Sequence, residues 1–173
     1  MLFRSVKIEV MQMKLIEVNQ VNDTLAEMVA LFRVELRSYK GIVSKPNIEA
    51  GREEMEEYLS AKFPVFAALV DGENAGYVVC RIDSKVVWVE SIFVKEEYRR
   101  HGVATALHSK AEEIAASYGD DTVYNYVHPN NHRMIEFLRK RGYTVLNLIE
   151  IRKPYQDEKL TQVIPVGEHE FDY

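Results

Sequence analysis

The segment 99–105 has the composition of an anion-binding turn. Arg99, Arg100 and His101 bring positive charge to a chain whose net charge is −5. Gly102 has no side chain, so a ligand can approach the backbone there, and Thr105 adds a hydroxyl. An apolar β-type run precedes the turn and an amphipathic run follows it. Because the first N–H groups of a helix have no internal partner and lie at the positive end of its dipole, we expect a phosphate group to bind here.

The glycine spacing in this turn distinguishes between kinds of phosphate site. A dinucleotide-binding fold needs G-x-G-x-x-G after a strand and a P-loop needs G-x-x-x-x-G-K-[ST], and neither pattern is present. The spacing Arg99-x-x-Gly102-x-Ala104 resembles the R/Q-x-x-G-x-G/A signature of the GNAT acetyltransferase superfamily, which cradles the pyrophosphate of acetyl-CoA. The resemblance implies an N-acetyltransferase with acetyl-CoA as cosubstrate. A protein that binds NAD or ATP at this turn is an alternative.

A second segment, 124–143, is similar to the family's N-x-x-A-x-x-x-Y-x-x-x-G-F motif. Asn131 matches the asparagine that commonly contacts the pantetheine arm, and Gly142 with Tyr143 matches the closing glycine–aromatic pair. The family's frequent tyrosine, which can protonate the leaving thiolate, would fall at Leu138, which has no proton to donate. This departure keeps a non-catalytic or weakly active acetyl-CoA-binding sensor or interaction module as an alternative function.

Two residues are candidates for acid–base chemistry. The resemblance implies direct attack of a primary amine on the thioester in a ternary complex, with no acyl-enzyme. Glu90 interrupts the apolar run Val86–Val94, where a carboxylate is costly unless it faces a polar cleft. We therefore predict Glu90 as the general base, with a structural ion pair as the alternative. Tyr126 is the predicted substitute for the missing tyrosine, with Tyr124 and His128 as neighbouring alternatives.

The strand before the turn has a predicted second role. Alternation places Trp88, Glu90, Ile92 and Val94 on one face, where Trp88 would wall the acceptor site or fill the core. The resemblance implies that the backbone of this strand pairs with the pantetheine amides and that the turn and the Asn131 segment hold the rest of the cosubstrate. The predicted cofactor-binding residues are Ile92, Phe93, Val94, Arg99, Arg100, His101, Gly102, Val103, Ala104, Thr105, Asn131 and Arg133.

Hydrophobic periodicity predicts the elements that position these residues. The expected strands are 14–18, 65–70, 75–82, 86–94, 122–127 and 143–152, and the expected helices are 22–38 (with a capping box of Thr24 and Glu27), 48–62, 103–118 and one from residue 131. This order resembles the GNAT fold, an α/β class of α+β type with a mixed, mostly antiparallel central sheet flanked by helices. We expect one domain over 1–173, with its core at 14–153 and an acidic tail at 154–173. Within the tail, 161–166 could add a strand, swap into a partner or stay loose.

Composition limits the compartment and the partners. The acidic pI of about 5.6 argues against nucleic acid as a partner. No run approaches the roughly 18 apolar residues of a membrane span, and the N-terminus lacks a signal-peptide core, so we expect no membrane partner. The single cysteine, Cys80, excludes a disulfide within one chain and fits a cytoplasmic location. Because its neighbours are strand-like, we interpret it as a buried, inert thiol.

Two further patterns favour structural interpretations. His128 and His132 are four residues apart, but Pro129 lies between them and no third ligand is near, so we expect no metal. The acidic residues of the second expected helix form a solvated face, or else attract a cationic amine to the acceptor site. The acceptor itself is a protein N-terminus, a lysine or a small amine such as a polyamine or an antibiotic, and a homodimer is an open alternative. The acidic residues are Glu49, Glu53, Glu54, Glu56 and Glu57.

Overall fold

The computed structural model describes residues 11–173 and divides into two compact units, one that ends at Glu136 and one at Phe137–Tyr173. Helix α4 begins in the first unit and ends in the second. The single-domain organisation expected over 1–173 stays a prediction. The elements are β1 Met13–Glu17, α1 Asp23–Ser38, α2 Ile48–Ser60, β2 Val65–Val70, β3 Glu73–Asp83, β4 Val86–Val94, the 3-10 turn η1 Glu96–Tyr98, α3 Val103–Ser117, β5 Tyr124–Asn125, α4 His132–Lys140, β6 Val163–Val166 and β7 His169–Asp172.

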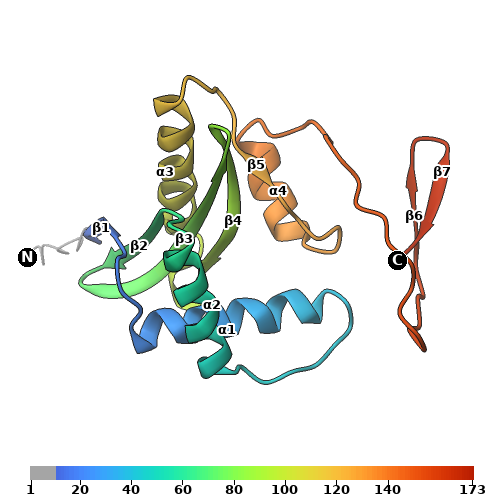
Figure 1. Cartoon of the computed structure of the whole chain (residues 1–173), viewed down its shortest axis with the longest axis horizontal. Coiled ribbons are helices and arrows are strands. Elements are labelled where there is room, and N and C mark those ends of the chain that lie inside the picture. The colour runs from blue at the N-terminus through green and yellow to red at the C-terminus, as the bar shows by residue number, and fades with distance from the viewer. Residues whose placement is uncertain (1–10) are drawn as a thin grey trace, which may run out of the picture. The chain divides into compact units, whose positions relative to one another are not determined.

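The first unit is built on a five-stranded sheet in the order β1-β2-β3-β4-β5. The first four strands pair antiparallel, and β5 joins β4 in parallel, as expected of a mixed, mostly antiparallel sheet. Helices α1 and α2 lie on one side of the sheet and α3 on the other (Figure 1). The core against α1 and α2 is filled by apolar side chains, which include Leu25, Met28, Met55, Tyr77 and Phe93.

Strand β4 contains an extra residue at Glu90. Val79 of β3 lies opposite Ser91 and the next residue, Cys80, lies opposite Val89, so Glu90 has no partner in the register. A bulge of this kind re-aims the side chains on either side of it and is over-represented next to active sites. The predicted catalytic glutamate therefore sits at the one irregular position of the β3–β4 ladder among the described residues.

The bulge also changes which side chains of β4 share a face. Trp88 lies opposite Arg81 and Ile92 lies opposite Val78, and directly opposed residues of an antiparallel pair point to the same side. Arg81 and Val78 are three residues apart on a regular stretch of β3, so they point to opposite sides. The single face predicted for Trp88 and Ile92 is therefore wrong, because strict alternation has no place for the extra residue. Glu90 shares the face of Arg81, to which it is hydrogen-bonded.

Strands β4 and β5 separate soon after they meet. They pair only at Trp88 with Tyr124 and Val89 with Asn125, after which β4 continues to Val94 with no described strand on that side. The strand predicted at 122–127 is thus shorter than expected. The loop that follows β5 turns toward α1, where Nδ2 of Asn130 donates a hydrogen bond to a backbone carbonyl at 2.9 Å. The side of β4 beyond the pairing is left open.

Helices α1 and α2 start with asparagine caps and cross closely. The side chain of Asn22 accepts a hydrogen bond from the N–H of Leu25 at 2.9 Å, and Asn47 caps α2 in the same way. The capping box predicted from Thr24 and Glu27 is wrong, because the N-cap residue is Asn22 and the helix starts two residues earlier than that box requires. Each cap satisfies one of the N–H groups that have no partner within the helix.

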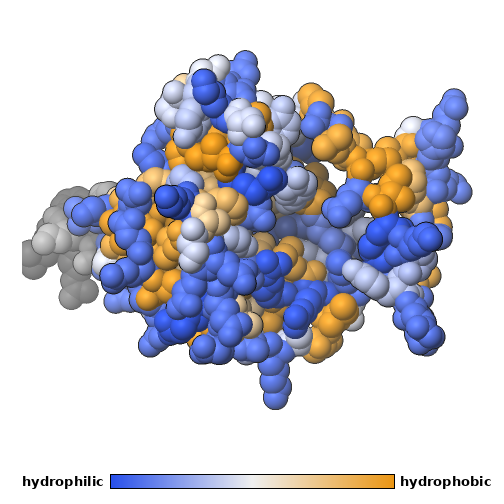
Figure 2. Space-filling view, viewed as in Figure 1, coloured by the Kyte–Doolittle hydropathy of each residue, from blue (hydrophilic) through white to orange (hydrophobic). Residues whose placement is uncertain are grey.

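The second unit contains a two-stranded sheet of β6 and β7, so the strand considered at 161–166 is present. The strand predicted at 143–152 is wrong, because the residues there form no strand in the structure. A strand needs a neighbour to pair its backbone, and within 137–173 no strand lies beside this segment. Its apolar side chains stay in solvent, with Val145 86% and Leu148 77% exposed. Figure 2 shows hydrophobic side chains gathered along the corresponding stretch of the chain.

No helix among the described residues has both the length and the apolar character that a bilayer span demands.

Candidate functional site

The N-terminus of α3 is open, unlike those of α1 and α2. Gly102 is its N-cap residue, with φ of 81°, and no side chain hydrogen-bonds to the cap. The first intrahelical bond runs from the N–H of Ala106 to the carbonyl of Gly102 at 3.0 Å. The N–H groups of Val103, Ala104 and Thr105 therefore have no partner within the helix. Glycine suits this place because a side chain is strained at that φ.

Arg100 and His101 are the two residues just before the N-cap of α3. Arg100 adopts the left-handed conformation, with φ of 64°, which non-glycine residues seldom occupy and which recurs at ligand-binding sites. Arg100 and His101 are both exposed beside the free N–H groups. The structure thus places both predicted side chains at the open end of α3, where the charge of Arg100 can add to the positive end of the helix dipole.

Arg99 has a different environment from Arg100. Its Nε donates to the carbonyl of Val94 at 2.8 Å, and its Nη2 donates to Oε1 of Glu35 on α1 at 2.5 Å. The guanidinium also lies over the ring of Phe93, 5.5 Å from the centroid. These contacts fasten the turn to β4 and α1. Direct contact of Arg99 with a phosphate stays a prediction, as does the pairing of the Val94 backbone with a ligand.

Asn131 and Arg133 lie at the start of α4 within the first unit. The Oδ1 of Asn131 accepts a hydrogen bond from the N–H of Met134 at 3.1 Å, so the asparagine caps the helix and its Nδ2 is the group left to donate. Arg133 lies 3.4 Å from Glu35, the residue that also holds Arg99. Glu35 therefore connects the two segments predicted to hold the cosubstrate. Sequence reasoning missed Glu35, because nothing along the chain relates it to either arginine.

The two predicted catalytic residues meet at a third residue, Arg81. Its Nε donates to Oε2 of Glu90 at 3.1 Å, and its Nη2 lies 3.3 Å from the hydroxyl of Tyr126. The guanidinium also lies over the ring of Trp88, 4.4 Å from the centroid. Trp88 is half-buried and packs beside Tyr124 at 5.5 Å, so it belongs to this polar–aromatic group rather than to the closed core. Catalysis by Glu90 and Tyr126 stays a prediction.

A second group missed by sequence reasoning connects α1 and α2. Arg33 and Glu54 form a two-armed ion pair with both N–O distances 2.6 Å, and the hydroxyl of Tyr58 donates to Glu54 at 2.6 Å. Burial, the hydrogen bond to Glu54 and, more weakly, the charge of Glu90 raise the pKa of Tyr58 above its ordinary value. Tyr58 is therefore a protonated phenol at neutral pH.

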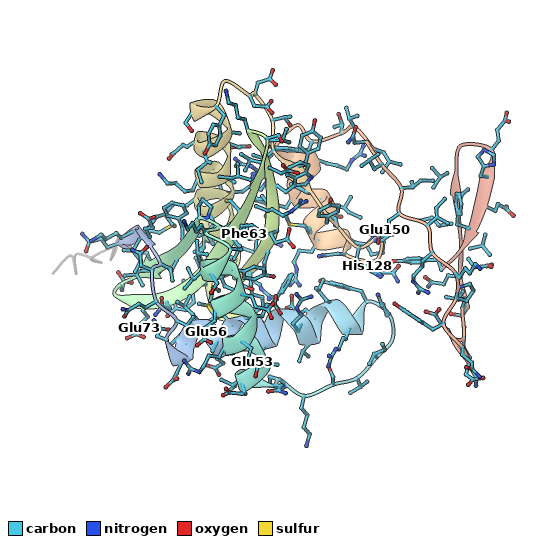
Figure 3. All side chains as sticks on the ribbon, in the orientation of Figure 1. Glu53, Glu56, Phe63, Glu73, His128 and Glu150 are labelled. Atoms are coloured by element: carbon cyan, nitrogen blue, oxygen red, sulfur yellow. The ribbon has the colours of Figure 1, made fainter. Side chains whose placement is uncertain are left out.

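A cleft of about 660 Å³ opens between α1, α2 and the loop that follows β5. That volume is in the range of small-molecule sites. Its lining includes Arg33 and Glu54 on the helices and His128 on the loop. The ring of His128 stacks on Tyr39 with centroids 5.7 Å apart. In Figure 3 the labelled Glu53 and Glu56 lie on the part of α2 remote from His128, and neither lines the cleft.

Cys80 is buried, which confirms its interpretation as a packing residue. Burial raises the pKa of its thiol to about 12, so it carries almost no thiolate at neutral pH. The described residues contain no group of three or more His, Cys, Asp or Glu side chains that could hold a metal ion.

Comparison with known families gives a match over more than half of the chain. The model of the acetyltransferase (GNAT) family matches residues 28–143. An N-alpha-acetyltransferase of Sulfurisphaera tokodaii is 32% identical over 110 residues, which cover 56% of this chain and 64% of that protein. An uncharacterized N-acetyltransferase of Methanocaldococcus jannaschii is 32% identical over 85 residues, which cover 45% of this chain and 38% of that protein. The chain thus spans less than two thirds of the length of these curated relatives.

Solved structures share the fold. The aminoglycoside N-acetyltransferase AAC(6')-Iy in complex with CoA has a TM-score of 0.63 at 23% identity, covering 86% of this chain and 99% of that one. The protein PH1933 of Pyrococcus horikoshii OT3 has a TM-score of 0.62 at 18% identity, covering 81% of this chain and 94% of that one. These likenesses confirm the fold class expected from the order of elements.

Proposed function

This chain belongs to the GNAT acetyltransferase family, and on that premise we propose that it transfers the acetyl group of acetyl-CoA to a primary amine by direct attack. The observation that carries the proposal is the uncapped N-terminus of α3 at the end of a strand whose outer side is open. The helix N-terminus suits the pyrophosphate of the cosubstrate, and the free backbone of β4 suits its amides. The CoA complex of a protein with the same fold supports this choice of ligand.

Each binding residue has a distinct part in this proposal. The N–H groups of residues 103–105 donate to the pyrophosphate, and Arg100 and His101 add positive charge beside it. The backbone of Ile92, Phe93 and Val94 pairs with the pantetheine amides along the open side of β4. Arg99 holds the turn in place through Glu35, and Nδ2 of Asn131 donates to the pantetheine arm.

The chemistry needs a neutral amine and a route for one proton. Glu90 takes a proton from the attacking ammonium group, directly or through water. The amine nitrogen then bonds to the acetyl carbon while the carbon–sulfur bond breaks, and Tyr126 gives its hydroxyl proton to the leaving thiolate. The nitrogen loses its second proton through water to the Tyr126 phenolate, and Glu90 releases the first proton to solvent, so the products are the amide and free CoA thiol with both residues restored. Arg81 orients both residues, since it donates to the carboxylate of Glu90 and to the hydroxyl oxygen of Tyr126. Positioning of the two reactants supplies much of the rate.

A non-catalytic acetyl-CoA-binding module is the second candidate. Two observations favour it: Leu138 stands where the family's tyrosine would be, and Glu90 is already paired with Arg81. In that case the protein binds acetyl-CoA and no variant of Glu90 changes any turnover. The enzyme proposal instead predicts that Glu90→Gln lowers kcat by about 10²-fold or more while the affinity for acetyl-CoA is kept.

Calorimetric titration of acetyl-CoA, CoA and NAD tests the site itself, with Thr105→Glu and Thr105→Gln as a matched pair. Thr105 is exposed in the first turn of α3, where a glutamate favours the helix but repels a phosphate. We expect micromolar binding of the two CoA ligands and none of NAD. Thr105→Glu should weaken that binding about tenfold or more, and Thr105→Gln should change it little.

Folded protein that fails to bind either CoA ligand would refute the proposed function. Binding of NAD in place of CoA would assign the turn to a different nucleotide. Equal binding by both Thr105 variants would remove the N-terminus of α3 from the site.

A further inference from the structure

The cleft between α1 and α2 carries an excess of positive charge, although the chain as a whole has a net charge of −5. Its charged lining consists of four basic side chains and a single carboxylate, Glu54. Arg33 is neutralised by Glu54 through two hydrogen bonds of 2.6 Å. Arg37, Lys40 and Lys45 remain, and none of them forms an ion pair within residues 11–173.

The other groups around the cleft do not cancel this charge. The remaining acidic residues of α2 are absent from the lining, and Figure 3 shows Glu53 and Glu56 remote from His128. Burial and then the positive charge of Lys40 lower the pKa of His128, so its ring is neutral at pH 7. The cationic side chains thus face a cavity whose one carboxylate is already engaged. A carboxylate-bearing ligand would supply the missing countercharge.

The cleft adjoins the loop that carries the predicted acid. His128, in the lining of the cleft, lies two residues after Tyr126 and three residues before Asn131. Tyr126 in turn contacts Arg81, which donates a hydrogen bond to the predicted base Glu90. A molecule in the cleft therefore lies beside the loop that joins the predicted acid to the segment predicted to hold the pantetheine arm, which suits an acceptor.

We propose that the acceptor amine belongs to a molecule that also carries carboxylates, and that Arg37, Lys40 and Lys45 hold those carboxylates in the cleft. This inference rests on the proposed function and names its substrate class. The amine is an α-amine, because its pKa of about 7.8 lies much closer to neutrality than the value of about 10.4 for an alkylamine. A base that already pairs with Arg81 suffices for such an amine. An acidic peptide N-terminus and a free dicarboxylic amino acid share this chemistry.

Thiol release from acetyl-CoA measures the preference directly. The acceptors are six-residue peptides that begin with serine and carry Glu, Gln or Lys at positions two to four, together with free glutamate and, as a polycation, spermidine. We expect kcat/KM for the Glu peptide to exceed that for the Gln peptide about tenfold, from three exposed charge pairs, and the Lys peptide and spermidine to be poorer still. The preference should shrink in 0.5 M salt, because the screening length there is only about 3 to 5 Å.

Charge reversal assigns the preference to these residues. The double variant Arg37→Glu with Lys40→Glu should invert the order of the Glu and Lys peptides while the calorimetric affinity for acetyl-CoA stays within about twofold. Lys14→Glu on β1, an exposed position outside the cleft, is the matched control and should keep the original order. Retained helical circular dichroism excludes misfolding of the double variant.

The possible outcomes distinguish a failure of this inference from a failure of the proposed acetyltransferase function. Turnover of the Lys peptide or spermidine at rates equal to or above the Glu peptide would overturn the inference and leave the acetyltransferase proposal standing. Acetyl-CoA binding with no turnover of any acceptor would also overturn it, whereas loss of acetyl-CoA binding itself would refute the proposed function. Faster turnover of the Glu peptide than of free glutamate would identify a protein N-terminus as the source of the carboxylates, and the reverse would identify a small molecule.

Discussion

Arg81 and Glu35 each hold together residues that are distant in the sequence. Arg81 lies on β3 and connects Glu90 of β4 with Tyr126 of the loop after β5. Glu35 lies on α1 and connects Arg99 with Arg133. Both are single charged side chains with two oppositely charged or polar partners, and both are half-buried, where such contacts are worth more than on an open surface. They set the geometry on which the proposed chemistry depends.

Removal of the Glu35 carboxylate should therefore destabilise the first unit. Glu35→Ala leaves Arg99 with one partner in a half-buried place, and we expect the free energy of unfolding in urea to fall by about 1–2 kcal/mol. Glu113→Ala is the control, because it removes a carboxylate from an exposed pair with Lys110 on α3. This variant should change the free energy of unfolding by less than about 0.5 kcal/mol. Equal losses in the two variants would contradict a special role for Glu35.

The crossing of α1 and α2 determines the shape of the cleft. A Cβ at Gly51 would lie 3.0 Å from the backbone nitrogen of Ala30 and closer still to the carbonyl oxygen of Ala26. Backbone atoms in a helix have little room to move, so only glycine lets the two helices approach this closely. Since Gly51 and Ala30 also line the cleft, its walls depend on this contact.

Gly51→Ala tests that crossing. Alanine favours an isolated helix over glycine, but here its methyl group must push α1 and α2 apart, which we expect to lower the free energy of unfolding by about 1–3 kcal/mol. Ser60→Ala, at an exposed position near the end of α2, is the matched control and should change stability little. Thermal unfolding followed by circular dichroism measures both. A stabilised Gly51→Ala protein would show that the helices do not cross as described.

Within residues 11–173, the segment 143–152 carries a run of exposed apolar side chains. Its sequence has the apolar character of a strand, and the described residues of the second unit give it no strand to pair with. Leu146 and Ile151 are 71% and 65% exposed, next to the exposed Val145 and Leu148. Apolar surface of this kind in a contiguous run favours association.

We accordingly expect the protein to form a homodimer at micromolar concentration, with this segment in the interface. Replacement of Leu146 and Leu148 by glutamate should shift the mass in sedimentation equilibrium from dimer to monomer. Replacement of Lys153 and Lys159 by glutamine changes the charge of the same unit by as much without touching the apolar run, and should leave the dimer intact. A wild-type protein that is monomeric at 100 μM would contradict the expectation.

Local patterns in the sequence predicted much of the fold. The strand, the glycine turn and the helix around 99–105 were predictable because they depend only on neighbouring residues, and anion binding at that turn stays a prediction. The buried thiol of Cys80 was likewise predictable from its apolar neighbours. The strand at 143–152 was not, because apolar composition shows what a segment can pair with but not whether a partner strand lies beside it.

The sequence by itself determined the order of elements, the family signature and the open start of α3, because each depends on residues close together in the chain. Tertiary structure alone decided that Glu90 lies at a bulge, that Arg81 joins it to Tyr126, and that the acidic α2 borders a cleft whose charged lining is mostly basic. Arg81 and Tyr126 are 45 positions apart in the sequence, and only the folded chain brings them together. A motif confined to one turn can be recognised in the sequence. The residues around the proposed acceptor cleft, in contrast, come together only when the chain folds.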